Sequence, residues 1–248
     1  MSQARVLYQF PLSHYCEKAR WVLDFKGLSC QPRNLLPGPH RVFTRVRAAI
    51  DTLPLLHDGQ RWVGDSTRIA YYLDKYYPQP ALLPADAELR RTVIELEQQY
   101  DRLGVAVRRW MFGEVLGSET VAQALLGPYR LPALARRWYR PVLERGIRLL
   151  YRVTPTEQRR ALERIEQGLA ALEARLPEQG DGYLVGDRLT LADITAAALL
   201  APLVAAPGTP WEGWHQDPTL PASFRNQLQA FRSRPAGQWV LRRYQQDR

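Results

Sequence analysis

Residues 7–23, LYQFPLSHYCEKARWVL, decide how the rest of the chain is interpreted. The first part is short and apolar and predicts a strand over 5–10. The second part predicts a helix over 15–25 that Gly27 closes. The turn between them presents Ser13 and Cys16 at the start of that helix. A helix N-terminus carries unpaired N–H groups and about half a positive charge, so it stabilises a nearby anion. The pattern is therefore typical of a site that holds a thiolate.

The next segment completes a small α/β unit. A second strand within 31–35 makes the first helix part of a strand–helix–strand unit. A break at 37–40 is followed by a short basic amphipathic segment over 41–50. Leu53-Pro54 then leads into a third strand, and Asp58-Gly59 predicts the turn of a hairpin whose fourth strand ends near residue 63. The following helix runs to residue 77, and polar residues at its start can cap it.

After the proline-rich stretch 78–84, the chain has the pattern of helices throughout. Apolar residues recur every three or four positions over 86–116 and 155–176, which predicts two long amphipathic helices. A strongly apolar helix over 194–204 opens at Thr190 and Asp193, whose side chains can form a capping box. Two further helices are predicted over 222–231 and 236–246.

These patterns divide the chain into two parts. We expect an α/β domain over 1–78, a linker over 79–88 and an all-helical domain over 89–248. The helical part carries an arginine-rich insert near 117–154.

Composition excludes several classes of protein. The 248 residues are 46% hydrophobic and 24% charged, and they contain no apolar run of about eighteen residues that could span a membrane. The N-terminus lacks the pattern of a secretory signal. The two cysteines, Cys16 and Cys30, favour a reducing, cytoplasmic compartment. The net charge is +9, but no nucleic-acid-binding motif accompanies it, so no nucleic acid partner is expected. No metal site is predicted.

Three motifs resemble the glutathione transferase family, a branch of the thioredoxin-like fold. The first is Ser13–Arg20 followed by Lys26-Gly27-Leu28. The second is Leu53–Gly59 followed by Asp65-Ser66, and the third is Gly186–Asp193. The resemblance covers both parts of the chain. It implies a thioredoxin-like N-terminal domain with an all-α C-terminal domain. It also implies a cytoplasmic detoxification enzyme, working as a homodimer, that transfers glutathione to an apolar electrophile.

The resemblance also implies roles for individual residues in a glutathione site. Ser13 matches the serine that holds the thiolate in zeta- and theta-like members. Leu53, before a cis Pro54, would pair through its backbone with the cysteinyl unit. Asp65 would meet the γ-glutamyl ammonium, and Ser66 would meet the γ-glutamyl carboxylate. For the glycyl carboxylate, the expected groups are His40 and Arg41. Two departures from the family pattern are His14, where a proline is usual, and Asp51-Thr52 before Leu53-Pro54.

Other interpretations of these residues stay open at this point. Ser13 can act only as the helix cap, and Cys16 can serve a glutathione-dependent thiol oxidoreductase, although a structural role for Cys16 is favoured. Tyr8 can donate to a thiolate, but its place in the strand favours core packing. The electrophile is expected between the domains, against Leu12, Trp110 and Met111, and Tyr129 is a further candidate for this contact.

The insert is the part of the chain that the resemblance does not explain. Residues 129–152 contain seven arginines and one acid, Glu144, with aromatic and aliphatic residues between them. Such a segment can rest on an anionic membrane surface, as part of a non-catalytic binding protein or of an enzyme. It can also be an extra helical pair packed on the domain, with arginine stems covering apolar surface. We favour the packed pair.

Overall fold

The structure is a computed structural model that describes residues 5–176 and 182–248. Its N-terminal part contains a mixed four-stranded sheet in the order β2-β1-β3-β4. The strands are β1 (Arg5–Gln9), β2 (Cys30–Asn34), β3 (Leu55–Asp58) and β4 (Arg61–Gly64). β1 and β2 are parallel, whereas β3 is antiparallel to both of its neighbours. The predicted strands and the hairpin are therefore confirmed.

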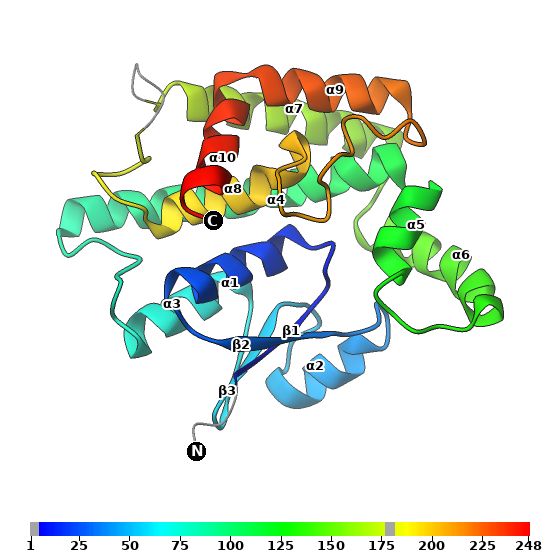
Figure 1. Ribbon diagram of the computed structural model, residues 1–248, viewed down its shortest axis with the longest axis horizontal. Helices are drawn as coiled ribbons and strands as arrows, with labels where there is room; N and C mark the ends of the chain where they lie inside the picture. The colour runs from blue at the N-terminus through cyan, green and yellow to red at the C-terminus, as the bar shows by residue number, and fades with distance from the viewer. Residues whose placement is uncertain (1–4, 177–181) are drawn as a thin grey trace.

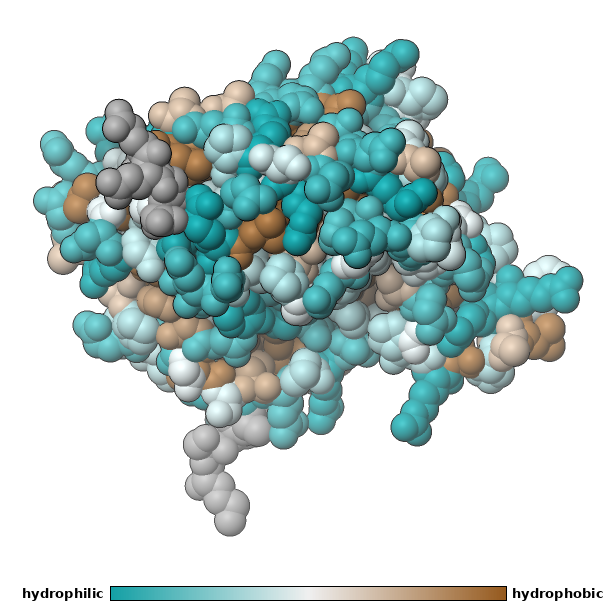
Figure 2. Space-filling model, turned by 45° about the horizontal axis from the view of Figure 1, so that its top comes forward, coloured by the Kyte–Doolittle hydropathy of each residue, from teal (hydrophilic) through white to brown (hydrophobic). Residues whose placement is uncertain are grey.

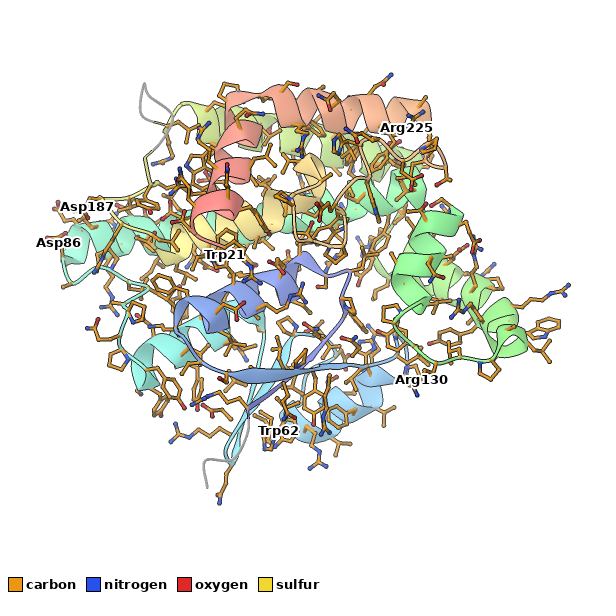
Figure 3. All side chains as sticks on the ribbon, in the orientation of Figure 1. Trp21, Trp62, Asp86, Arg130, Asp187 and Arg225 are labelled. Carbon is orange, nitrogen blue, oxygen red and sulfur yellow. The ribbon has the colours of Figure 1, made fainter. Side chains whose placement is uncertain are left out.

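Helices cover both faces of this sheet. They are α1 (His14–Phe25), α2 (His40–Ala48) and α3 (Ser66–Tyr76). Figure 1 shows α1 above the sheet, next to the helical layer, and α2 on the opposite side. Trp62 of β4 lies on the α2 side, while Trp21 of α1 points toward the helical layer (Figure 3).

The C-terminal part is all-helical, as predicted. Its helices are α4 (Ala87–Val115), α5 (Glu119–Leu126), α6 (Ala133–Leu150), α7 (Pro155–Glu173), α8 (Leu191–Val204), α9 (Ala222–Ser233) and α10 (Pro235–Gln246). Every residue of α8 is buried, because this helix lies between α4, α1 and α10. The predicted capping box at its start is present: the Thr190 N–H donates to the Asp193 carboxylate over 2.8 Å. Among the described residues, no helix is long and apolar enough to cross a membrane.

The α1 helix is joined closely to α4. Gly104 of α4 faces Tyr15 of α1 and Leu199 of α8, and a Cβ atom at this glycine would lie 3.0 Å from each of them. The Tyr15 hydroxyl donates to the Asp101 carbonyl over 2.8 Å. This close approach fixes the N-terminal end of α1, where Ser13 lies, against the helical part.

The arginine-rich insert forms the pair α5–α6, which projects at the right of Figure 1. It packs on the N-terminal part through two tyrosine hydroxyls. Tyr129 donates to the Leu35 carbonyl over 2.7 Å, and Tyr139 donates to the Pro37 carbonyl. The prediction of a packed helical pair therefore holds for the inner side of α6. The outer face of α6 is exposed, which the sequence did not predict.

Candidate active site

The topology of the sheet gathers the candidate residues at one edge. β1 and β2 are parallel, so both end at this edge, and the segments after them carry Ser13 and His40. β3 runs antiparallel to β1, so Leu53-Pro54 lies at the same edge, just before β3 begins. β4 returns antiparallel to β3 and delivers Asp65-Ser66 there. Residues from four separate segments therefore meet at the N-terminal ends of α1, α2 and α3.

Ser13 caps α1 by accepting a hydrogen bond, which does not use its own proton. Its side-chain oxygen accepts from the Cys16 N–H over 3.3 Å. A serine hydroxyl has one proton and two lone pairs, so accepting this bond leaves the proton available. The cap and a contact to a thiolate are therefore compatible. The two interpretations of Ser13 do not exclude each other.

Pro54 adopts the cis conformation after Leu53, in agreement with the prediction. Its carbonyl accepts from the Asp65 N–H over 3.2 Å, which connects this turn to the start of α3. Leu53 lies outside the β1–β3 ladder, whose first paired residue on β3 is Leu55. The Leu53 backbone is thus at the open edge, where an extended peptide can pair with it.

The start of α3 contains a buried hydroxyl without a partner. Asp65 caps the helix by accepting from the Thr67 and Arg68 N–H groups, both over 3.0 Å. Ser66 is 1% exposed, and its hydroxyl oxygen has no hydrogen-bond partner among the described residues. Buried polar groups without partners are uncommon and call for an explanation. A carboxylate bound at this helix N-terminus would supply the missing acceptor.

His40 and Arg41 begin α2 at the same edge of the sheet. The His40 ring contacts Phe10 edge-on, and its Nδ1 accepts from the Gly38 N–H over 3.0 Å. Burial lowers the pKa of His40, so this ring is neutral at pH 7 and Arg41 carries the positive charge. Of the two residues expected at the glycyl carboxylate, Arg41 is therefore the one that can attract it by charge.

Cys16 lies behind Ser13 and is fully buried. It packs in the cluster with Val6, Tyr8 and Leu55, on the α2 side of the sheet. Burial raises the pKa of the Cys16 thiol, so very little of it is thiolate at pH 7. A structural role fits this position, and the oxidoreductase alternative is not favoured. Tyr8, considered as a second thiolate donor, packs against Phe43 and Trp62 in this cluster.

We expect Cys16→Ala to leave turnover within about threefold of wild type, because a buried neutral thiol takes no part in the chemistry. The measurement is steady-state kinetics together with the rate of labelling by a thiol reagent. In the native protein both cysteines should react slowly, since burial also raises the pKa of Cys30, to about 11. Rapid labelling of Cys16, or loss of turnover in Cys16→Ala, would contradict this prediction and support a thiol oxidoreductase that uses Cys16.

An apolar pocket adjoins Ser13 on the helical side. Leu12 and His14, the neighbours of Ser13, form one wall. The full lining is Leu12, His14, Arg108, Met111, Phe112, Val115, Val121, Pro202, Trp211 and Trp214. The structure places Leu12 and Met111 together here, as the sequence suggested. It places Trp110 elsewhere: this ring packs against Phe224 and Phe231 in the core.

The sequence reasoning assigned only Leu12 and Met111 to this pocket and missed its eight other residues, among them His14, Arg108, Trp211 and Trp214. His14 was noted only as a departure from the family pattern, although its neighbours Leu12 and Ser13 were both assigned. The two tryptophans lie in the turns between α8 and α9, where no periodicity marks an inward-facing side chain. Tyr129 lies outside this lining, with its hydroxyl on Leu35.

His14 is neutral in the folded protein. Its Nε2 lies 3.1 Å from the Gly104 carbonyl, which can only accept, so Nε2 carries the proton. Burial, with a smaller contribution from Arg108, lowers the pKa of His14 to about 3 from an ordinary value of 6.5. Between these two pH values the unfolded chain binds a proton at His14 that the folded chain does not bind.

The free energy of unfolding should therefore fall as the pH drops below 6.5, because proton uptake at His14 favours the unfolded chain. We expect His14→Gln, which can still donate to Gly104, to remove part of this dependence. Urea unfolding of both proteins above and below pH 6.5 measures the difference. Parallel pH dependences in wild type and variant would mean that His14 titrates normally in the folded state.

Comparisons with known proteins agree with this arrangement. Residues 7–81 match a family model described as "Glutathione S-transferase, N-terminal domain". Residues 155–232 match one described as "Glutathione S-transferase, C-terminal domain", and together these ranges take in more than half of the chain. Neither range includes the α5–α6 pair.

Among curated proteins, the chain is 38% identical to Glutathione S-transferase Z1 of Arabidopsis thaliana over 88 residues. These residues make up 34% of this chain and 39% of that protein. The zeta class glutathione S-transferase of Euphorbia esula is 36% identical over 84 residues, covering 32% and 37%. The matched region thus spans about two fifths of the length of these relatives.

Solved structures show the same fold over nearly the whole chain. Glutathione transferase GSTFuA3 from Phanerochaete chrysosporium superposes with a TM-score of 0.65 at 21% identity, over 100% of this chain and 98% of that one. CsGST63524 from Ceriporiopsis subvermispora, solved in complex with glutathione, gives 0.62 at 19%, over 99% and 98%. At these identities the likeness concerns the fold alone.

Proposed function

Because the chain belongs to the glutathione S-transferase family, we propose that it is a glutathione transferase that joins the glutathione sulfur to an apolar electrophile. The observation that carries this proposal is the convergence at one sheet edge of the Ser13 hydroxyl, a cis-proline turn and the Ser66 hydroxyl, which has no partner among the described residues. Each of these three features offers what one part of an anionic tripeptide requires.

In the proposed binding mode, charged groups hold the two ends of glutathione and the protein backbone holds its middle. The γ-glutamyl carboxylate occupies the N-terminus of α3 and accepts from the Ser66 hydroxyl, while Asp65 meets the ammonium. The cysteinyl unit pairs with the Leu53 backbone. The glycyl carboxylate faces Arg41, with His40 as a neutral neighbour. This order places the thiol next to Ser13.

Ser13 lowers the barrier by holding the thiolate. A free thiol has a pKa of about 8.5, and each unit of lowering corresponds to about 1.4 kcal/mol. A hydrogen bond to a charged group contributes about 1.5–3 kcal/mol, so one Ser13 donor can lower the thiol pKa by one to two units. The thiol proton goes to solvent. The sulfur then forms a bond to carbon, and the leaving group of the electrophile departs with its electron pair.

The family resemblance supports two further parts of the proposal. The protein would work as a homodimer in the cytoplasm, and residues 79–88 would link its two domains. Sedimentation equilibrium tests the first, because a monomer at micromolar concentration would contradict it. Limited proteolysis tests the second, with first cuts expected in 79–88.

The proposed reaction is tested by conjugation of glutathione to chlorodinitrobenzene, followed by absorbance. Wild type should show saturation in glutathione, and the thiolate absorbance should rise when glutathione is added to the enzyme at neutral pH. A wild-type protein that binds glutathione but shows neither the thiolate signal nor turnover would contradict the transferase and leave a binding protein.

A further inference from the structure

The outer face of α6 carries an apolar stripe. Among the described residues, ten large hydrophobic side chains are exposed, and five of them lie on this one helix. Four of the five are each at least 68% exposed: Leu134, Trp138, Val142 and Leu149. They recur at steps of four and seven residues, so they lie along one side of the helix. In Figure 2 brown and teal side chains lie together on the projection at the right, where Figure 1 shows α6.

The inner side of α6 is fixed to the rest of the protein. Arg140 joins Glu119 of α5 over 2.6 Å, and the Tyr139 hydroxyl donates to the Pro37 carbonyl in the segment between β2 and α2. Ile147 is buried. Because these contacts hold one side of the helix, the apolar stripe faces away from the core of the protein. A contiguous apolar patch of this kind marks a surface that contacts a partner from outside the chain.

Arginines accompany the stripe. Arg145 lies within it, one helical turn from Val142 on one side and from Leu149 on the other. Arg137 and Arg148 lie together along one border of the stripe. All three arginines are exposed. The face is therefore apolar and cationic at the same time.

The nearby acids do not neutralise this face. The α5–α6 pair contains two acids, Glu119 and Glu144, and Arg140 pairs with both of them, over 2.6 and 2.9 Å. In the described part of the chain, neither Arg137 nor Arg145 has an acidic partner. Their charges are therefore available to a partner that is itself anionic.

A second copy of the chain does not match this face. In a two-fold contact the same patch meets itself. Arg137 and Arg145 of one copy would then lie against the same arginines of the other, and the described residues of the outer face of α6 include no acid to compensate them. Like charges brought together at an interface oppose binding.

An anionic phospholipid surface matches both properties of the face. Its phosphates pair with arginines, and the boundary between headgroups and acyl chains accepts tryptophan and aliphatic side chains. The place of Arg145 within the stripe is compatible with this surface, because an arginine stem can lie along apolar groups while its charged end reaches a phosphate.

We infer that α6 anchors the protein in the plane of an anionic phospholipid surface. Trp138 and Val142 enter the boundary between headgroups and acyl chains, and Arg137 and Arg145 bind phosphates. The anchor uses α6 alone and involves no glutathione, so a test of it succeeds or fails independently of the proposed transferase reaction.

The first test is flotation with phospholipid vesicles in the absence of glutathione. Vesicles that contain phosphatidylglycerol should recover the wild type, and pure phosphatidylcholine vesicles should recover at least about tenfold less. Added salt should release the protein, because screening weakens the attraction between arginines and phosphates. Equal recovery of wild type with both kinds of vesicle, or recovery with neither, would overturn the inference.

Trp138 reports directly which surface meets the lipid. It is 71% exposed, whereas five of the other six tryptophans are buried and Trp62 is half-buried. Lipids with brominated acyl chains quench a tryptophan that reaches them, so they should quench part of the wild-type fluorescence. Trp138→Phe should keep flotation, because phenylalanine is also apolar, and should lose this quenching. Quenching that persists in Trp138→Phe would show that another surface meets the bilayer.

A pair of substitutions tests the apolar stripe. Trp138→Ser with Val142→Ser should lose most of the binding to phosphatidylglycerol vesicles. The matched control is Val42→Ser with Val46→Ser on α2, which removes two valines that are 70% and 78% exposed. The control should bind like the wild type. An equal loss in both double variants would mean that α6 is not the anchor.

A second pair tests the charges. Arg137→Gln with Arg145→Gln should weaken vesicle binding by about tenfold or more, since each cationic residue near an anionic surface contributes a factor of about five. Arg90→Gln with Arg102→Gln on α4 removes two other exposed arginines and changes the net charge by the same amount. It should have a much smaller effect. An equal effect would show that net charge alone drives the binding.

Sedimentation of the apolar variant distinguishes the remaining partner. Trp138→Ser with Val142→Ser should leave the oligomeric state of the wild type unchanged. A change of oligomeric state would identify the face as a contact between copies and overturn the inference.

Discussion

Replacing Ser13 by alanine should lower kcat for conjugation by about 100-fold or more, while glutathione affinity changes by less than about threefold. The size follows from the loss of one aligned donor to a reacting anion, which costs about 10²–10³ in rate. The thiol pKa of bound glutathione should return toward that of the free thiol. A titration of thiolate absorbance against pH, with and without the substitution, measures this shift.

Ser13 also caps α1, so the variant loses about 1 kcal/mol of stability for a separate reason. Ser118→Ala is the matched control, since Ser118 caps α5 by accepting from the Val121 N–H over the same 3.3 Å. It should lose similar stability and keep its turnover. Ser13→Asp should keep the cap but repel the thiolate. Near-normal turnover in Ser13→Ala or Ser13→Asp would mean that another group holds the sulfur.

Replacing Lys18 by methionine should have the largest effect on stability, about 3–5 kcal/mol. The Lys18 ammonium is fully buried and lies 2.5 Å from Glu97 of α4, 2.9 Å from the Thr67 hydroxyl of α3 and 3.5 Å from Asp101. It therefore connects α1, α3 and α4. Without it, the Glu97 carboxylate would remain buried and uncompensated, which is the main cost. Urea unfolding measures the loss.

Two further variants show whether the loss of stability in Lys18→Met comes from the buried Glu97 charge. Lys18→Met with Glu97→Gln should be less destabilised than the sum of the single changes, because the pair is then neutral. Arg91→Met removes an ion pair whose side chains are 81% and 63% exposed, so it should change stability by less than about 1 kcal/mol. A loss below about 1 kcal/mol for Lys18→Met would mean that water reaches Glu97 and replaces the ammonium.

Several features of the fold were predictable because they are local. The Ser13 cap, the Asp58-Gly59 turn and the capping box at Thr190 each depend on residues within a few positions of one another. The strand and turn pattern predicted the four strands and the hairpin, whereas their order in the sheet, which brings Ser13 and Ser66 to one edge, is seen in the structure.

The features that the sequence did not predict depend on contacts between residues that lie far apart in the chain. Trp110 and Met111 are neighbours on α4, but one ring faces α9 and the other side chain faces the pocket. Periodicity identifies a buried stripe and not the partner that each part of the stripe meets. The Tyr129 contact to Leu35 spans 94 residues.

The most direct test is calorimetric titration of glutathione into wild type and Ser66→Ala. The Ser66 hydroxyl has no partner in the described structure, so its removal should leave stability unchanged or slightly higher. If it meets the γ-glutamyl carboxylate, the same change should weaken glutathione binding by about tenfold or more. Unchanged stability with weakened binding is the predicted result. No binding to wild type at millimolar glutathione, or equal affinity in the two proteins, would contradict the proposed site.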